Sequence, residues 1–435
     1  MEAILDNSFV TFSVPKSTLV NQSFPICLSG FSQGQHVTIR AKTKDGERKI
    51  FESYATFIAD IDGNIDSSIQ KPISGTYDEV DSMGLFWSMK PEDKRKNSFF
   101  IKTKSTPLIY QLTAEVDGKM VAETEIERFF VSPTVAKMQV EDSDLIGTLY
   151  YPKDSPPIAG VIVLSGSDGG SREDAAALLA AHGFAALALP YFGVEDLPKN
   201  LMNIPLEYFG RAIHWLQDQS FISNDRIGVI GLSRGGELAL LLGTKYPEIS
   251  AVIAASPSAY HYAGLSNFRP QPYPSWTYHN EPLHYLKSKF DIGSIFRFYK
   301  NLITRQPISN LAGFYKTLKD RTQTDAASIP VEHIKGSVML ISGGDDQLWP
   351  SSLFAETVME RLDDYNHPYS NIHLHYKDAG HFLCFPYVLP NIPPNIMMSP
   401  WGGMTITFGG SDKANTKSSL DSWPKILDFL KKNLA

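Results

Sequence analysis

Ser233 has the sequence context of a catalytic nucleophile. It lies in Gly231-Leu232-Ser233-Arg234-Gly235, directly after the apolar run 227–230 and directly before a helical pattern. In this strand-turn-helix setting the serine sits on a tight turn at the edge of a sheet, beside helix N–H groups that stabilise negative charge. The glycines are needed because Cβ atoms on either side of the turn would collide. The pattern predicts a nucleophile, with a glycine-rich turn of no chemical role as the alternative.

His381 is the predicted base. A serine hydroxyl is a weak nucleophile at neutral pH, and in this setting its partners follow in the order Ser, Asp or Glu, His. His381 ends the loop Asp378-Ala379-Gly380-His381, which follows a predicted strand at 371–376. His373 and His375 alternate within that strand and share one face, which favours packing or solvation over catalysis. A metal pair at these two positions is the alternative, but no third ligand suggests itself.

The predicted acid lies in the loop after the preceding strand. That loop reads Gly343-Gly344-Asp345-Asp346-Gln347-Leu348-Trp349-Pro350. Asp346 is preferred over Asp345 because a proline four residues further on resembles the usual hydrolase acid loop. The alternative is that the acidic pair only caps the helix predicted from Ser351, since helix N-termini favour carboxylates.

Two backbone N–H groups are the predicted donors to an oxyanion. The first belongs to Arg234, the residue after the nucleophile. The second comes from the loop Ser165-Gly166-Ser167-Asp168-Gly169-Gly170, where Ser167 is the predicted position. The side chain of Arg234 is expected either to meet an anionic substrate or to pair with a nearby carboxylate.

The elements that hold these residues form an α/β pattern. Apolar runs separated by helical patterns imply a mostly parallel sheet covered on both faces. A stretch of about seventy residues at 259–330, rich in Tyr, Phe and Pro, interrupts this order and is predicted to form a lid. The predicted strands are 158–165, 184–190, 226–232, 249–255, 337–342 and 371–376, and the predicted helices are 171–182, 205–219, 234–246, 351–362 and 422–433.

The N-terminal part reads as a separate all-β domain. Leu108, Tyr110 and Leu112 alternate with polar neighbours, and Asp117-Gly118 separates this strand from a second one, which predicts a hairpin. Repeated short strands predict an immunoglobulin-like sandwich at 1–136, followed by the α/β-hydrolase domain at 137–435. Ser132-Pro133-Thr134 is the predicted boundary.

Composition and charge narrow the possible partners and the cellular compartment of the protein. The 435 residues carry a formal charge of −7, which gives no reason to expect nucleic acid as a partner. Cys27 and Cys384 are far apart, so a disulfide framework is not expected, and with no secretory signal the cytoplasm is the predicted compartment. No apolar stretch approaches the roughly 20 residues of a membrane span. The sequence does not specify an oligomeric state.

The chain resembles the family of acyl-CoA thioesterases and bile-acid-CoA:amino-acid N-acyltransferases over nearly its whole length. In the N-terminal half the similar stretch runs from Gly75-Thr76-Tyr77 through Met83-Gly84-Leu85-Phe86-Trp87-Ser88-Met89-Lys90-Pro91. In the C-terminal half the similar segments are His182 to Leu189, Tyr191-Phe192-Gly193, Glu195-Asp196-Leu197-Pro198, Glu207-Tyr208-Phe209, Gly344-Asp345-Asp346, Trp349-Pro350-Ser351, Gly380-His381, Pro386-Tyr387 and Trp401-Gly402-Gly403.

The resemblance implies that Ser233, Asp346 and His381 act as nucleophile, acid and base on an acyl-CoA thioester. It implies no cofactor, because coenzyme A enters as part of the substrate. The N-acyltransferases of this family use cysteine, so a serine favours hydrolysis over transfer to an amine. The alternatives are a carboxylic-ester or dienelactone-type hydrolase, an acyl-CoA:amino-acid N-acyltransferase, and a binding protein without catalysis. Two departures from the family concern the substrate site: the long insertion at 259–330, and Ser167 with Asp168 in a loop that is usually richer in glycine.

Overall fold

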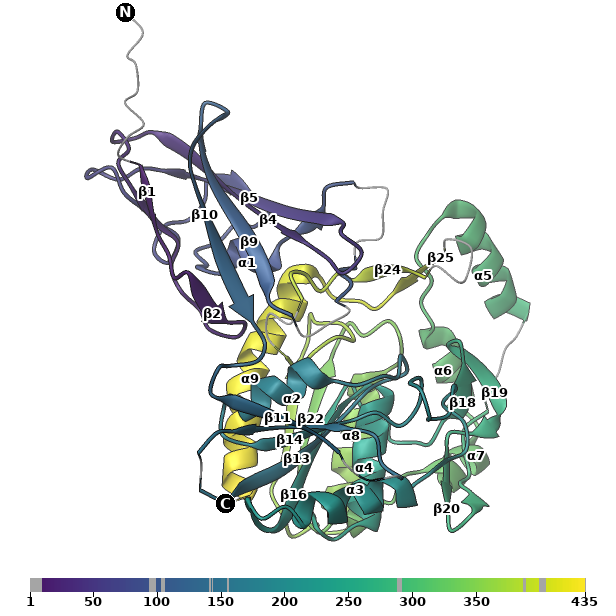
Figure 1. Ribbon diagram of the computed structural model, residues 1–435. Helices are drawn as coiled ribbons and strands as arrows, with labels where there is room; N and C mark the ends of the chain where they lie inside the picture. The colour runs from purple at the N-terminus through teal and green to yellow at the C-terminus, as the bar shows by residue number, and fades with distance from the viewer. Residues whose placement is uncertain are drawn as a thin grey trace, which may run out of the picture. The chain divides into compact units, whose positions relative to one another are not determined.

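The chain divides into two compact units in the computed structural model (Figure 1). Unit 1 comprises Met1–Val131 with Pro386–Pro393, and unit 2 comprises Ser132–Phe385 with Pro394–Ala435. The structure describes residues 10–93, 99–102, 106–140, 142, 144–154, 156–287, 292–385, 389–398 and 404–434.

Unit 1 is built from two β-sheets. One has three strands in the order β1-β3-β6, and the other has seven, in the order β2-β10-β9-β4-β5-β7 with β8 paired to β5. All pairs are antiparallel except β2 with β10. The elements are β1 (Thr11–Ser13), β2 (Ser17–Leu19), β3 (Cys27–Ser29), β4 (His36–Lys44), β5 (Ile50–Ile58), β6 (Ile65–Asp66), β7 (Ser74–Gly75), α1 (Gly84–Trp87), β8 (Lys90–Pro91), β9 (Leu108–Val116) and β10 (Lys119–Phe129).

The predicted hairpin of unit 1 is confirmed. Val116 of β9 pairs with Lys119 of β10, so Asp117-Gly118 forms a two-residue connection. Both residues have positive φ, 50° and 74°, as the turns that suit the twist of a two-residue hairpin require. Every second side chain of β9 is buried, which confirms the predicted inward face.

Unit 2 has an α/β-hydrolase fold around an eight-stranded sheet. The order is β11-β12-β14-β13-β16-β17-β22-β23; β11 and β12 pair antiparallel with each other and β12 with β14, and all other pairs are parallel. The six predicted strands are confirmed, to within a few residues at their ends. The strands are β11 (Val135–Gln139), β12 (Thr148–Pro152), β13 (Ile158–Leu164), β14 (Ala185–Leu189), β16 (Ile222–Leu232), β17 (Ile249–Ala255), β22 (Ser337–Gly343) and β23 (Asn371–Tyr376).

Helices cover both faces of this sheet. A Cβ added at Gly160 would lie 2.9 Å from Leu216 of α3, and one added at Gly228 would lie 3.0 Å from Leu434 of α9, so helices pack closely against the central strands. The sheet is buried and apolar, as the continuous apolar runs predicted. These helices are α2 (Glu173–Ala180), α3 (Glu207–Gln217), α4 (Arg234–Lys245), α8 (Ser351–Asp364) and α9 (Asp412–Leu434), with a 3-10 helix at Val331–His333.

The C-terminal helix is longer than predicted. We expected residues 422–433, whereas α9 begins at Asp412 and contains Pro424. Its first turns are polar, and Ser418 and Ser419 both donate hydrogen bonds to the Asn415 carbonyl oxygen. Without an apolar repeat these turns resembled a loop in the sequence.

The segment 259–330 leaves the sheet and returns to it at one point. The Ile329 N–H donates to the Ala259 oxygen (3.0 Å), and the His261 N–H donates to the Ala327 oxygen (2.8 Å). These bonds close a narrow neck between β17 and β22. The segment contains β18 (Ala263–Ser266), β19 (Arg269–Pro274), β20 (Trp276–Tyr278), β21 (Glu281–Pro282), α5 (Ile292–Thr304), α6 (Leu311–Thr317) and α7 (Arg321–Ala327).

Three further short strands of unit 2 lie outside both this segment and the eight-stranded sheet. They are β15 (Ile204–Pro205), β24 (Asn395–Met398) and β25 (Met404–Thr407).

Candidate active site

Ser233 sits on a strained turn between β16 and α4. Its φ of 61° and ψ of −121° lie outside the regions that residues with a side chain ordinarily adopt. Its N–H donates to the Ala255 oxygen at the end of β17 (2.9 Å), which holds the turn in place. A Cβ on Gly231 would lie 2.1 Å from the Gly235 oxygen, and one on Gly235 would lie 2.4 Å from the Ser165 oxygen. The elbow therefore needs both glycines, as predicted.

His381 and Asp346 are hydrogen-bonded to each other. The His381 Nδ1 lies 2.8 Å from the Asp346 Oδ2, and the two residues are only 1% and 4% exposed. The other carboxylate oxygen of Asp346 accepts from the N–H groups of Leu348 (2.9 Å) and Trp349 (3.2 Å). The carboxylate is thus fixed from both sides, and it holds the histidine with its Nε2 free to accept a proton.

Three backbone contacts hold the His381 loop. The Ser256 hydroxyl donates to the His381 oxygen (2.6 Å), and the His381 N–H donates to the Phe408 oxygen (2.9 Å). The preceding amide, of Gly380, donates to Oδ1 of the buried Asn415 in α9 (2.7 Å). These bonds join the loop to the end of β17, to the segment after β25 and to the C-terminal helix.

Consecutive residues connect the serine and the histidine. Ala255 accepts the bond from the Ser233 N–H, and Ser256 donates to the His381 carbonyl. The structure therefore brings Ser233, Asp346 and His381 to the same edge of the sheet. Within the described part of the chain the buried His381 Nε2 has no hydrogen-bond partner, and a bond to the Ser233 hydroxyl is not formed in this state. Such bonds are often long in free enzymes and tighten when substrate binds.

The loop after β13 lies beside the serine. A Cβ added at Gly166 would be 3.6 Å from the Ser233 Cβ, and Gly166 and Ser167 form a turn closed by the bond from the Gly169 N–H to the Gly166 oxygen (3.2 Å). Arg234 is the first residue of α4, a position whose N–H has no acceptor within the helix. Arg234 directly follows Ser233, and Gly166 lies beside it, so the backbone of both segments borders the serine.

The Arg234 side chain binds a carboxylate of its own helix. Its guanidinium lies 2.6 Å from the Glu237 carboxylate, and both side chains are buried. It also donates to the Tyr262 oxygen (3.1 Å), the Ala263 oxygen (3.2 Å) and the Ser275 hydroxyl. Of the two roles predicted for the Arg234 side chain, the structure shows the pair with a nearby carboxylate. It also shows hydrogen bonds from this side chain to the insertion at 259–330.

Glu237 extends that connection. Its Oε1 accepts from the Trp276 indole N–H (2.8 Å) and from the Tyr262 N–H (3.3 Å). Burial raises the pKa of Glu237, and Arg234 together with these donors opposes the rise. The charged pair thus stays compensated in an apolar region. Sequence reasoning missed Glu237, Asn415 and Ser256, because the partner of each lies far away in the sequence and the residue itself belongs to no catalytic motif.

Two residues that were not chosen as catalytic, Asp345 and His373, have hydrogen-bond partners of their own. Asp345 is exposed and accepts from the Gly410 N–H (2.8 Å) and the Gln347 amide (2.7 Å). The His373 Nε2 lies 2.7 Å from the Ser342 hydroxyl, and burial lowers the pKa of this histidine. Among the residues the structure describes, no group of three or more His, Cys, Asp or Glu side chains is arranged to hold a metal ion.

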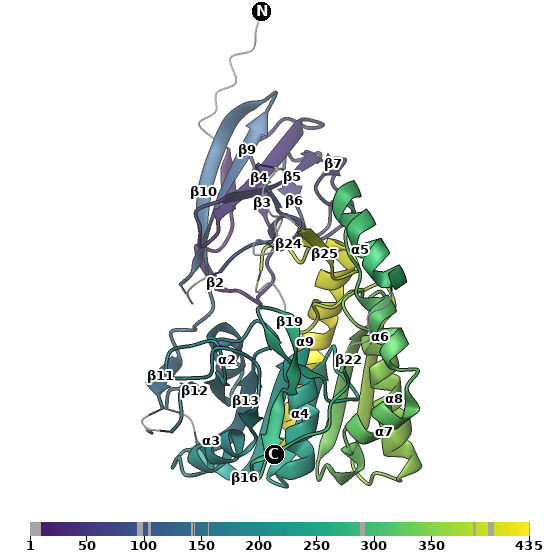
Figure 2. The ribbon, with the colours of Figure 1, turned by 90° about the vertical axis from the view of Figure 1, so that its right-hand side faces the viewer.

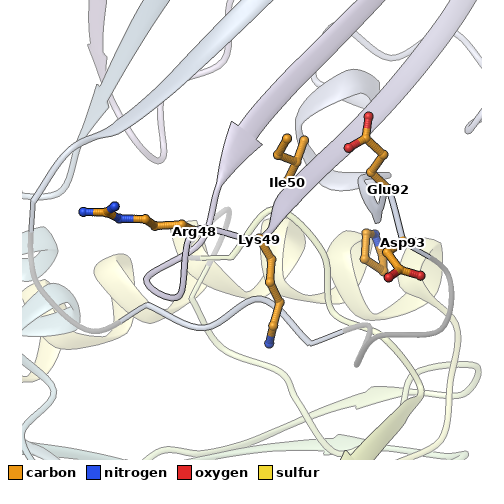
Figure 3. Close-up of a pocket in the computed structure, with 6 residues that line it drawn as sticks. Arg48, Lys49, Ile50, Glu92 and Asp93 are labelled. Carbon is orange, nitrogen blue, oxygen red and sulfur yellow. The ribbon is translucent and has the colours of Figure 1, made fainter.

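Two hollows found in the described surface contain none of the residues of this site among their lining residues. One, of about 150 Å³, is in unit 1 and is lined by Arg48, Lys49, Ile50, Pro91, Glu92 and Asp93 (Figure 3). Figure 3 shows the Arg48, Lys49 and Glu92 side chains pointing in different directions, and Lys49 and Glu92 already have ion-pair partners in Glu47 and Lys42. A second hollow lies beside Ile158 and Leu434, at the opposite end of β13 from the serine.

Comparison with known families places the chain in one family. Residues 204–435 match the family model described as BAAT / acyl-CoA thioester hydrolase C terminal, and residues 21–142 match the acyl-CoA thioester hydrolase/BAAT N-terminal region. The chain belongs to the BAAT / acyl-CoA thioester hydrolase family. The resemblance found in the sequence is therefore confirmed. Two of its segments, Pro386-Tyr387 and Trp401-Gly402-Gly403, lie outside the described residues.

Relatives of this protein align with almost the whole length of its chain. Acyl-coenzyme A thioesterase 1 of Mus musculus is 28% identical over 424 residues, which cover 95% of this chain and 94% of the relative. Peroxisomal succinyl-coenzyme A thioesterase of Mus musculus is 28% identical over 420 residues, with 95% and 94% covered. Acyl-coenzyme A thioesterase 2, mitochondrial, of Homo sapiens is 28% identical over 415 residues, with 94% and 81% covered.

Solved structures resemble this protein more weakly than these relatives do. An esterase of Pyrococcus furiosus aligns with a TM-score of 0.39 at 15% identity, covering 69% of this chain and 93% of that one. A likeness of this size carries no functional information. Separately, no helix in the described part of the chain has the length and apolar content needed to cross a membrane.

Proposed function

We propose that this protein is an acyl-CoA thioesterase that works through an acyl-enzyme on Ser233. The observation that carries the proposal is the convergence of a strained serine at the start of α4 with the buried His381 and Asp346 pair, 2.8 Å apart, at one edge of the sheet. Membership of the family and the names of the aligned thioesterases support the substrate class.

The first half-reaction acylates the serine. Ser233 Oγ attacks the thioester carbonyl carbon while its proton moves to the His381 Nε2. Asp346 stabilises the imidazolium through the bond to Nδ1. The oxyanion is held by the Arg234 N–H and an N–H of the Gly166-Ser167 turn. Collapse breaks the carbon-sulfur bond, and His381 returns the proton to the departing thiolate of coenzyme A.

The second half-reaction frees the acid. Water gives a proton to His381 and attacks the ester carbonyl, and the proton returns to Ser233 Oγ as the carboxylic acid leaves. An acyl oxyester reacts with amines less readily, relative to water, than an acyl thioester does. Ser233 therefore favours hydrolysis over transfer to an amino acid. Coenzyme A is needed only as part of the substrate, and no other cofactor enters.

A panel of CoA esters tests the proposal. The full chain is incubated with saturated acyl-CoA esters from two to eighteen carbons, and free thiol is measured. The expected result is thiol release that depends on Ser233, at least a thousandfold above the same acyl groups offered as simple oxyesters. A thousandfold preference in the opposite direction would instead identify an ester hydrolase. Amide formation on adding glycine or taurine would identify an acyltransferase.

The domain assignment belongs to the same proposal. We propose that residues 1–136 form a sandwich domain of the family's N-terminal type, that residues 137–435 form the catalytic domain, and that the segment at 259–330 acts as a lid. The buried Trp276 and Tyr262 support the lid assignment, because they join the inner part of that segment to the serine elbow. The cytoplasm remains the predicted compartment.

A further inference from the structure

Helix α5 (Ile292–Thr304) exposes an apolar stripe. Phe296, Tyr299 and Ile303 are 69%, 57% and 80% exposed. Their spacing of three and four residues places them on one face of the helix. Figure 2 shows α5 at the margin of unit 2, with α6 and α7 below it, and Figure 1 agrees. Three large side chains in one line differ from the isolated exposed apolar residues found on most surfaces.

The inner side of α5 is partly polar. The Asn301 side-chain amide donates to the Pro307 oxygen (3.1 Å), and the Asn301 oxygen accepts from the Gln306 N–H (2.9 Å). Phe298 on that side is only half-buried. A surface helix ordinarily turns its large apolar side chains inward, whereas α5 leaves Phe296, Tyr299 and Ile303 exposed in addition to the apolar residues of its other side.

The sequence around the stripe is basic. From residue 283 to residue 319 the chain has seven lysines and arginines and one acidic residue, Asp291, although the whole chain has a net charge of −7. Lys300 lies one turn after Phe296 on the same helix, and Arg305 follows the helix end; both are exposed. A basic flank beside an apolar face is the pattern of helices that lie in the interface of an anionic membrane.

We propose that α5 docks this protein onto the surface of anionic lipid bilayers, with Phe296, Tyr299 and Ile303 inserted among the acyl chains and Lys300 and Arg305 against the headgroups. A second copy of the chain fits the stripe less well, because a symmetric contact would bring the same basic segment against itself. The proposal does not rest on the proposed thioesterase activity, since adsorption is measured without substrate.

Vesicle flotation tests the proposal. The full chain is mixed with vesicles of phosphatidylcholine alone or with 30% phosphatidylserine, and bound protein is measured at low and high salt. We expect binding to the anionic vesicles at least about tenfold above the neutral ones, weakened by salt because counterions screen the headgroups. F296S/I303S is expected to lower this binding at least tenfold, and K300E/R305E is expected to abolish the preference for phosphatidylserine.

Matched variants make the result specific. I69S changes an isoleucine that is 74% exposed in unit 1, and K335E reverses an exposed lysine outside the insertion; both are expected to bind vesicles like the parent. Circular dichroism and the urea unfolding midpoint should be unchanged in F296S/I303S, because the stripe is exposed. The proposal is overturned if the parent does not bind anionic vesicles, or if F296S/I303S binds them equally well. It is also overturned if sedimentation shows that the stripe joins two copies and vesicles are not bound.

Discussion

The guanidinium of Arg234 and the carboxylate of Glu237 form a buried ion pair of 2.6 Å one turn into the helix that follows the nucleophile. Both partners also bind the insertion, Arg234 through carbonyl oxygens of β18 and the preceding residue, and Glu237 through the Trp276 indole. The serine elbow and the proposed lid are therefore one structural unit. A change at this pair acts on both.

Breaking this pair should cost much stability. E237A leaves Arg234 charged and unpaired in an apolar region, and we expect a loss of about 3 to 5 kcal/mol in the free energy of unfolding. The double variant R234M/E237L removes both charges and should lose clearly less. Urea unfolding of the two variants and the parent measures this difference. Equal losses in the single and double variants would contradict the account.

Replacing the nucleophile should remove the reaction and leave the fold. S233A is expected to lower kcat at least about 10³-fold, since the other members of such a triad cannot replace the serine. Thiol release from the CoA ester cleaved fastest by the parent measures the loss. The unfolding midpoint should not fall, because Ser233 occupies a strained turn that its hydroxyl does not stabilise. Unchanged turnover would support a binding protein whose hydrolase fold is inert.

The two neighbouring aspartates should behave very differently. D346N places an amide against the His381 Nδ1 and favours the wrong tautomer, so we expect kcat to fall by about 10³- to 10⁴-fold. D345N is the matched control, because Asp345 is exposed and its carboxylate accepts hydrogen bonds from the Gly410 N–H and the Gln347 amide, away from His381. Its kcat should stay within about threefold of the parent. Equal effects would mean that the acid has been misassigned.

Asn415 should position His381 without touching substrate. N415A removes the acceptor for the Gly380 N–H and the donor to the Gly409 oxygen. The His381 loop then loosens, and kcat should fall about ten- to a hundredfold with little change in KM. S418A is the control, since among the described residues that hydroxyl bonds only to the Asn415 carbonyl oxygen, within α9. Recovery of kcat in N415D, which keeps the acceptor, would separate positioning from loss of fold.

The protein should lose stability in acid because of His261 in the insertion. Burial lowers the pKa of His261 to about 4, and its Nδ1 bonds to the His284 oxygen (3.2 Å), so the ring is neutral in the folded state. In the unfolded chain its pKa is about 6.5. Between these values the unfolded state binds the extra proton, and stability is lost as pH falls, by about 2 to 3 kcal/mol between pH 7 and pH 4.5.

His261→Asn keeps a donor for the His284 oxygen and cannot titrate. Its stability should therefore depend less on pH over this range. Urea unfolding at pH 7, 5.5 and 4.5 compares the two proteins. Parallel pH profiles would exclude His261 as the cause.

The sequence predicted the sheet of unit 2 well because buried parallel strands are continuous apolar runs. It also predicted Ser233, Asp346 and His381, since each lies in the turn or loop that follows a predicted strand, and the structure brings them to one edge of the sheet. It failed where polar residues are held by distant partners. The first turns of α9 have no apolar repeat, and they are helical because Asn415 and its neighbours are packed beneath the His381 loop. Glu237 likewise resembled an ordinary helical glutamate, because its partner Trp276 lies 39 residues away in the sequence.

The neck at Ala259 and Ile329, where the insertion leaves and re-enters the sheet, has a consequence for evolution. Residues between these two points can lengthen, shorten or be exchanged without altering the strands that carry the reacting groups. Changes in this one segment can thus alter the substrate range and the cellular location of the protein while the catalytic chemistry stays the same. The constraints on such exchange are the contacts with Arg234 and Glu237, the pairing of β20 with β15, and the bond from the Asn310 N–H to the Gln347 oxygen in the acid loop.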